Sequence, residues 1–265
     1  MSILQAISDI GLLRDINEDY AFCSSHPKNP TIKLMVLADG MGGKCQGDVA
    51  SQEVVADIEA WFYHEDVGIL SEIEGLDAIL DKRIVGMNNY LIQKYGENFL
   101  GTTLTLAIVG RERTLFYNIG DSRGYIYKDK DLIQITEDDS GVWSYYKYGD
   151  VDKDDLRFFP TNNFITACVG LNENFCKSHS YVVKNDYDMV LLVTDGVTDL
   201  LSDNDIRKHL VKKKQKEILK GIIDTAVHKD LKLKVPTSLK MKYKGRFTVP
   251  IHGRDNASGV IYIKD

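Results

Sequence analysis

The order of hydrophobic and polar positions predicts two buried strands that each end on an acid. Residues 34–38 form an unbroken apolar run, which is typical of a strand buried on both faces, and residues 189–193 form another. Asp39 follows the first run and Asp195 follows the second after one threonine. Each carboxylate should therefore lie where its strand leaves the core, and the glycines after Asp39 should let the backbone turn or approach a ligand closely.

Helical spacing of apolar residues predicts three helical regions. Asp48 is expected to cap a helix by accepting from free backbone N–H groups. A second helix is predicted from about Leu76 to Tyr95, with Gly96 as its C-terminal cap. A third helical region follows Ser202, a predicted cap, and continues to about His228.

The remaining segments favour strands and loops. Short β-branched and apolar runs between residues 101 and 135 predict an antiparallel meander, and strands are expected again at Phe164, Ser180 and 259–263. Residues 136–164 mix acids with aromatic residues and show no period. We interpret them as a candidate lid over a site.

Composition is that of one globular domain. The chain has 265 residues, of which 43% are hydrophobic and 27% are charged, and no apolar run reaches the roughly 20 residues that span a bilayer. Its first residues do not resemble a signal peptide, so we expect a cytoplasmic, monomeric protein without membrane contact. The four cysteines lack the spacing of a disulfide framework or a zinc site.

Charge is distributed unevenly along the chain. The stretch from Lys208 to Arg246 holds 13 Lys and Arg against 3 Asp and Glu, whereas the rest holds 20 against 36. This basic stretch is interpreted as a solvated helical face or a docking surface for an acidic partner. It has the charge of a nucleic-acid site but no motif for one, so no nucleic acid is expected.

Acids recur at strand or loop ends beside Gly, Asn or Ser: Glu18, Asp19, Asp39, Asp121, Asp195 and Asp255. A single Asp-Gly after a strand is usually an ordinary turn. Several carboxylates at one place repel each other and are tolerated mainly around a divalent cation, for which oxygen ligands suit magnesium, manganese or calcium. The glycines fit neither a dinucleotide-binding loop nor a phosphate-binding loop. Cys45 stands where the first motif needs a glycine, and the second motif needs Ser or Thr at the same position, directly after Lys44. Met41 stands where an aspartyl-phosphate phosphatase would need a second acid.

Seven motifs in order resemble the PP2C (PPM) family of metal-dependent Ser/Thr protein phosphatases, in its bacterial form. They are residues 14–22, 39–43 with Gly47 and 50–51, 101–103, 118–123, 135–140, 192–196 with 201–203, and 255–256. The resemblance implies an α+β fold, an αββα sandwich of two antiparallel sheets flanked by helices. It implies one phosphatase domain over residues 1–265, with a flap at about 136–164 and a basic insertion at about 208–250.

The resemblance also implies a role for each site residue. Asp39 would bridge two Mn²⁺ or Mg²⁺ ions. Asp195 and Asp255 would complete one site, and Glu18 with the carbonyl of Gly40 would complete the other. Asp121 would help Asp195 to hold a possible third ion, Arg14 would grip the substrate phosphate, and Asp19 would support the ligands from behind. A metal-activated water would then hydrolyse phosphoserine or phosphothreonine, and the partners would be phosphorylated proteins, including a Ser/Thr kinase or its targets.

Two departures from the family pattern lie in or beside the flap. Asp139 stands where a histidine is common, and Ala167 stands where an arginine usually follows Thr166. They affect the handling of substrate more than the metal ligands. The alternative function is a catalytically weak or inactive binding module of the same fold.

Overall fold

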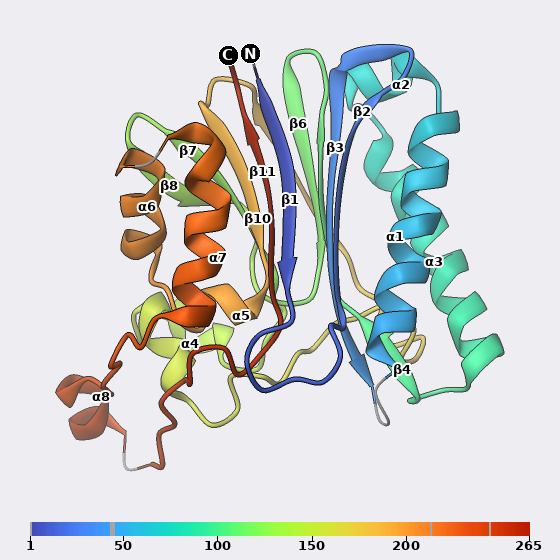
Figure 1. Ribbon diagram of the computed structural model, residues 1–265. Helices are drawn as coiled ribbons and strands as arrows, with labels where there is room; N and C mark the ends of the chain where they lie inside the picture. Colours follow the sequence, from blue (N-terminus) through green and yellow to red (C-terminus); the bar gives the residue numbers. More distant parts are fainter. Residues whose placement is uncertain (1, 43–45, 213, 244) are drawn as a thin grey trace.

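Two antiparallel sheets pack face to face, with helices on both outer faces (Figure 1). The structure is a computed structural model that describes residues 2–42, 46–212, 214–243 and 245–265. The two packed sheets with helices on both outer faces confirm the predicted αββα sandwich. Gly43, the last glycine of the motif after Asp39, lies outside the described residues.

Each sheet combines strands from distant parts of the chain. The first sheet has the order β1 (Ile3–Asp9), β11 (Ala257–Ile263), β10 (Met189–Val193), β7 (Arg123–Lys128) and β8 (Asp131–Gln134). The second has the order β2 (Asp19–His26), β3 (Asn29–Gly42), β5 (Leu104–Val109), β6 (Arg113–Ile119) and β9 (His179–Lys184), and β4 (Leu100–Thr102) pairs with the end of β3.

The helices divide between the two outer faces (Figure 1). The second sheet is covered by α1 (Gly47–His64) and α3 (Leu76–Tyr95), with the short α2 (Val67–Glu72) between them. The first sheet is covered by α6 (Asp203–Lys212) and α7 (Ile218–His228). Shorter elements are α4 (Trp143–Lys147), α5 (Asp195–Thr198), α8 (Thr237–Lys242) and the 3₁₀ turns Lys153–Phe158 and Gln215–Glu217.

The continuous apolar run of β3 is explained by burial on both faces. Leu34 and Val36 pack under the α1 and α3 layer, while Met35 and Leu37 pack between the two sheets. All four side chains are fully buried. Since successive residues of a strand point to opposite faces, a strand in the middle of the sandwich needs apolar residues at every position.

Several predicted elements form as expected. The helix Leu76–Tyr95 has the predicted bounds, and Gly96 follows it with φ at 100°. Ser202 caps α6, since its Oγ accepts from the backbone N of Asp205 at 3.1 Å. Among the described residues, no helix combines the length and apolarity needed to cross a lipid bilayer.

Other predictions are wrong in instructive ways. The expected meander is split, because β5 and β6 belong to one sheet and β7 and β8 to the other. Phe164 does not begin a strand; its neighbour Ile165 forms only an isolated bridge with Ser140. Asp48 lies inside the first turn of α1 and does not cap it.

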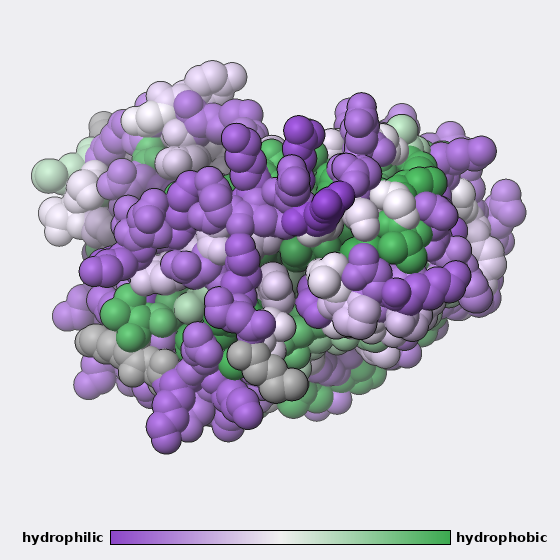
Figure 2. Space-filling model, turned by 90° about the horizontal axis from the view of Figure 1, so that it is seen from above, coloured by the Kyte–Doolittle hydropathy of each residue, from purple (hydrophilic) through white to green (hydrophobic). Residues whose placement is uncertain are grey.

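The two ends of the sandwich differ. The chain termini lie at the upper end in Figure 1, and that end shows mostly hydrophilic residues with smaller hydrophobic patches (Figure 2). The opposite end collects the loop between β1 and β2, the end of β3, and α5 (Figure 1). The predicted acids lie at this opposite end.

Candidate functional site

One cleft of about 290 Å³ brings the predicted site residues together. It is lined by Arg14, Glu18, Asp39, Gly40, Asp121, Asp195 and Asp255, together with Met41, Gly42, Thr103, Asn163 and Ile165. Asp19 does not line the cleft; it lies buried beside it, in register with Asp39 across β2 and β3. Residues separated by up to 241 positions thus converge at one end of the sandwich.

Asp39 is held at this end by β3, which does not stop where we predicted. The strand continues to Gly42, and its last residues pair with β4. The backbone N of Asp39 donates to Thr103 Oγ1 at 2.9 Å, and its carbonyl accepts from the N of Thr103 at 2.9 Å. A Cβ on Gly40 would collide with the carbonyl of Gly47, so this glycine serves close packing of β3 against α1 and not a turn.

Glu18 performs the capping that the sequence assigned to Asp48. Its Oε1 accepts from the backbone N of Gly47 at 3.1 Å, at the first turn of α1. A carboxylate there is favoured by the free N–H groups and by the helix dipole. The main chain of Glu18 is fixed as well, because its N donates to Asn256 Oδ1 at 2.9 Å and its carbonyl accepts from Ser51 Oγ at 2.6 Å.

Among the residues that the structure describes, Asp195 Oδ1 and Asp19 Oδ1 are carboxylate oxygens near the cleft that are buried without a hydrogen-bond partner. Asp195 begins α5 directly after β10, and Asp19 Oδ2 accepts from Thr194 Oγ1 at 3.0 Å. A buried carboxylate oxygen without a partner is costly in free energy. Oxygen ligands of this kind fit a hard divalent cation.

The electrostatics of the cleft point the same way. Removal from water raises the pKa of Asp39 and of Asp195 well above the usual carboxyl value, and repulsion by neighbouring acids adds to the effect. Burial also raises the pKa of Asp121 to about 7, with repulsion by Asp138 and Asp199 as the next causes. Since each charged carboxylate makes its neighbours harder to ionise, a cation would relieve the whole group.

Arg14 reaches into the acids from the loop after β1. Its Nη2 lies 2.8 Å from Asp255 Oδ1, and its Nη1 lies 3.4 Å from Glu18 Oε2. Within the described ranges, no three His, Cys, Asp or Glu side chains are arranged closely enough to hold an ion as they stand. One physical reason is that Asp255 and Glu18 face the guanidinium, so these side chains would have to turn to bind a cation.

Asp139, the departure from the family pattern, has a structural role. Its Oδ2 accepts from the N of Gly120 at 2.9 Å, and its Oδ1 lies 3.0 Å from His179 Nε2. The acid therefore ties the flap to the loop that carries Asp121. His179, which no sequence motif singled out, extends from β9 and brings a histidine side chain beside this position.

Three charged groups near the cleft were not predicted: the buried pair Arg123 and Asp138, and the partly buried Asp199. Arg123 donates from Nε and Nη2 to Asp138, with the shortest distance at 2.7 Å. Asp199 accepts from Asn162 Nδ2 at 2.7 Å, and burial raises its pKa to about 6. Asp199 lies four residues after Asp195, and this i, i+4 spacing was the signal that could have placed both acids on one face.

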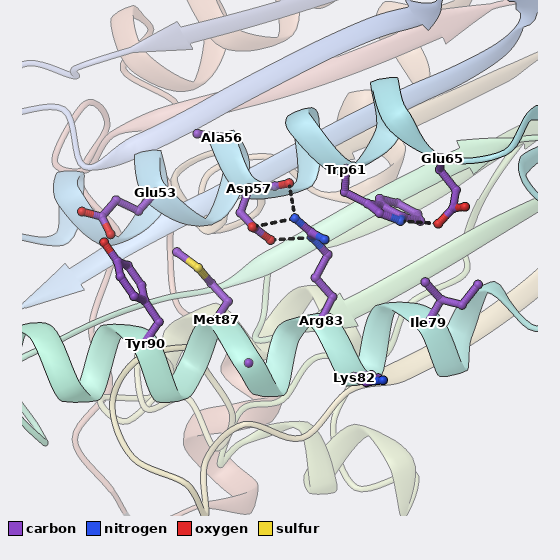
Figure 3. Close-up of a pocket in the computed structure, with 11 residues that line it drawn as sticks. Glu53, Ala56, Asp57, Trp61, Glu65, Ile79, Lys82, Arg83, Met87 and Tyr90 are labelled. Atoms are coloured by element: carbon purple, nitrogen blue, oxygen red, sulfur yellow. Dashed lines mark hydrogen bonds and ion pairs between the residues drawn. The ribbon is translucent and has the colours of Figure 1, made fainter.

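A larger cavity of about 790 Å³ lies elsewhere, between α1 and α3 (Figure 3). Arg83 crosses it and pairs with Asp57, with distances of 2.6 and 2.7 Å, while Trp61 Nε1 donates to Glu65 at 2.6 Å (Figure 3). The charged groups in its centre thus satisfy each other. The cavity contains none of the predicted site residues, and we do not assign the chemistry to it.

Comparisons with known proteins find relatives over most of the chain. The model of the family described as Protein phosphatase 2C matches residues 14–220. The Serine/threonine phosphatase stp of Listeria welshimeri is 32% identical over 214 residues, which cover 78% of this chain and 82% of that protein.

Solved structures show the same likeness. Serine/threonine phosphatase Stp1 from Staphylococcus aureus has a TM-score of 0.78 at 26% identity, covering 100% of this chain and 96% of that one. The catalytic domain of the serine/threonine protein phosphatase PstP in complex with two manganese ions has a TM-score of 0.73 at 27% identity, covering 99% and 97%.

Proposed function

The chain belongs to the protein phosphatase 2C family, and we propose that it hydrolyses phosphoserine and phosphothreonine in proteins with two divalent cations bound among its acids. The observation that carries the proposal is the convergence of Arg14 and the acids Glu18, Asp39, Asp121, Asp195 and Asp255 on one cleft. A relative of this chain was crystallised with two manganese ions, which supports manganese or magnesium as the cation here.

We assign the residues as follows. Asp39 would be shared by both cations, Asp195 and Asp255 would hold one, and Glu18 with the carbonyl of Gly40 would hold the other. Asp121, with Asp195, would hold a third. A pair of such cations supplies a hydroxide nucleophile at neutral pH and offsets charge on the phosphate oxygens.

The chain's own residues prepare that chemistry. The hydrogen bond from Asp39 N to Thr103 Oγ1 and the pairing of β3 with β4 hold the backbone of Asp39 in position at the cleft. Thr194 fixes Asp19 behind it. Arg14 is half-exposed at the edge of the cleft and presents a planar fork of donors, which suits bidentate binding of two phosphate oxygens.

The test is hydrolysis of a phosphothreonine peptide by the purified protein. We expect activity with Mn²⁺ or Mg²⁺ and its loss in EDTA, with recovery when the cation is restored. Activity that survives thorough chelation would refute the metal-dependent mechanism. Absence of any hydrolysis with either cation, by a folded protein that binds them, would favour the binding module.

A further inference from the structure

The late basic part of the chain packs against the flap. We use the term basic lobe for residues 231–250, which include α8 and lie beside α4 in Figure 1. Residues of the flap and the lobe form one apolar cluster in which Trp143, Leu156, Phe158 and Leu239 are buried. The match to the family model ends at residue 220, before the lobe begins.

Ring contacts and polar contacts join the two parts. Phe159 of the flap lies 5.5 Å from Tyr243 and 5.7 Å from Phe247, measured between ring centroids, and both pairs meet edge to face. Lys242 Nζ donates to the carbonyl of Asp150 at 2.6 Å, and the N of Thr248 donates to the carbonyl of Phe158 at 2.9 Å. The lobe is therefore fixed to the flap and keeps a defined place near the cleft.

Two adjoining hollows lead from the cleft to the lobe. The catalytic cleft shares Asn163 and Asp255 with a hollow of about 190 Å³. That middle hollow shares Val249, Pro250 and two more residues with an outer hollow of about 250 Å³. Lys232 lines the outer hollow. Because each hollow shares lining residues with the next, we treat them as one groove that an extended peptide could follow.

The walls and the far end of this groove differ in character. Phe159, Leu200, Val249, Pro250 and Ile251 form the apolar part of the middle hollow's walls, and the charged part is formed by Arg157, Asp199, Arg254 and Asp255. In sequence the lobe contains six Lys and Arg and no Asp or Glu, whereas the outer hollow is lined by Asp230 as well as by Lys232. Apolar and basic positions alternate there: Leu231, Leu233 and Val235 are partly buried, while Lys232 and Lys234 are exposed.

The two exposed lysines are available to a partner. Neither Lys232 nor Lys234 forms an ion pair with an acid of the described chain. Lysines with free ammonium groups beside a groove whose walls are partly apolar complement a peptide that is extended and acidic. Nucleic acid is not favoured as the occupant of this groove, because the groove ends in a cleft lined by carboxylates.

We propose that this groove holds the residues on one side of the phosphoserine or phosphothreonine, and that Lys232 and Lys234 select substrates with acidic residues on that side. The proposal rests on the proposed phosphatase function. It assigns to the lobe a role in substrate selection and none in the hydrolysis step.

The experiment compares phosphothreonine peptides in which a Glu or a Gln is placed at successive positions before and after the phosphorylated residue. We expect Glu to raise kcat/KM on one side only, by about three- to tenfold, chiefly through KM. K232Q/K234Q should remove that preference. Raising the salt concentration should weaken it in the wild type, because exposed charges are screened over about 8 Å at physiological salt.

The matched control is K28Q/K82Q, which removes two exposed lysines from the β2–β3 turn and from α3. It should keep the wild-type preference. Equal effects of Glu on both sides, no effect of Glu, or an unchanged preference in K232Q/K234Q would overturn the proposal. Hydrolysis of p-nitrophenyl phosphate with Mn²⁺ separates the groove assignment from the phosphatase function. If this small substrate is hydrolysed but the peptides show no preference for Glu, only the groove assignment fails. If it is not hydrolysed, both proposals fail.

Discussion

Replacing Asp121 with asparagine tests whether the acids of the cleft repel each other in the metal-free protein. Asp121 is 8% exposed, and burial together with the charges of Asp138 and Asp199 raises its pKa from 3.8 to about 7. A shift of roughly three units corresponds to about 4 kcal/mol of disfavour for the charged form above pH 7. Asparagine has a similar shape and no charge. D121N should therefore raise the free energy of unfolding in EDTA at pH 8 by about 1–3 kcal/mol, less than the full amount because its amide also needs partners.

The effect should depend on pH with a definite sign. Because the pKa of Asp121 is higher in the folded than in the unfolded state, the folded protein binds more protons between about pH 4 and pH 7. The contribution of Asp121 to stability is therefore fully present below pH 4 and is lost as the pH rises through 7. D121N lacks this loss, so its advantage over the wild type should be small at pH 5 and largest at pH 8.

Urea unfolding followed by tryptophan fluorescence, in EDTA at both pH values, measures the difference. D131N removes an exposed acid at the start of β8 and should change stability little at either pH. If D121N is no more stable than the wild type at pH 8, the acids do not repel as argued. Adding Mn²⁺ should narrow the difference, because the wild type would also bind the proposed third ion, for which D121N lacks a ligand.

Two further predictions concern the residues with assigned roles in hydrolysis. D39A should lower kcat for a phosphopeptide by at least about 10³-fold while the protein stays folded by circular dichroism, since both cations would lose a shared ligand; retention of more than a tenth of kcat contradicts that role. R14Q should raise KM for the peptide yet bind Mn²⁺ more tightly by calorimetry, because Arg14 pairs with Asp255 and Glu18 in the metal-free structure; weaker Mn²⁺ binding would count against this reasoning.

The sequence predicted those parts of the fold whose residue pattern reports their own surroundings. Residues 34–38 are apolar at every position because β3 is covered on both faces, and α3 shows helical spacing because one side faces a sheet. The crossing from β6 to β7 could not be predicted in this way. Short apolar strands have the same pattern in either sheet, and only the tertiary fold decides which sheet each one joins.

The acids could be predicted because each stands at the end of a recognisable strand or loop. Asp199 and the contact between the flap and the lobe were missed for a different reason. Asp199 directly follows the short helix α5 and has no motif of its own, and the lobe's aromatic residues, Tyr243 and Phe247, contact partners about 90 residues away. Such pairings depend on chain topology, which local patterns do not record.

Glu18 shows why the site could not be assembled from motifs alone. One of its oxygens accepts a hydrogen bond at the N-terminus of α1 and the other faces Arg14. The same side chain therefore caps a helix and offsets the charge of the guanidinium at the cleft. Arg14 in turn offsets the charge of Asp255, which a metal ion would otherwise offset. If the two proposed cations took over Asp255 and Glu18, the guanidinium would be left free for another anion. Binding of the cations would then be linked to the availability of Arg14 for phosphate, and both would depend on the fold that brings residues 14–18 beside residue 255.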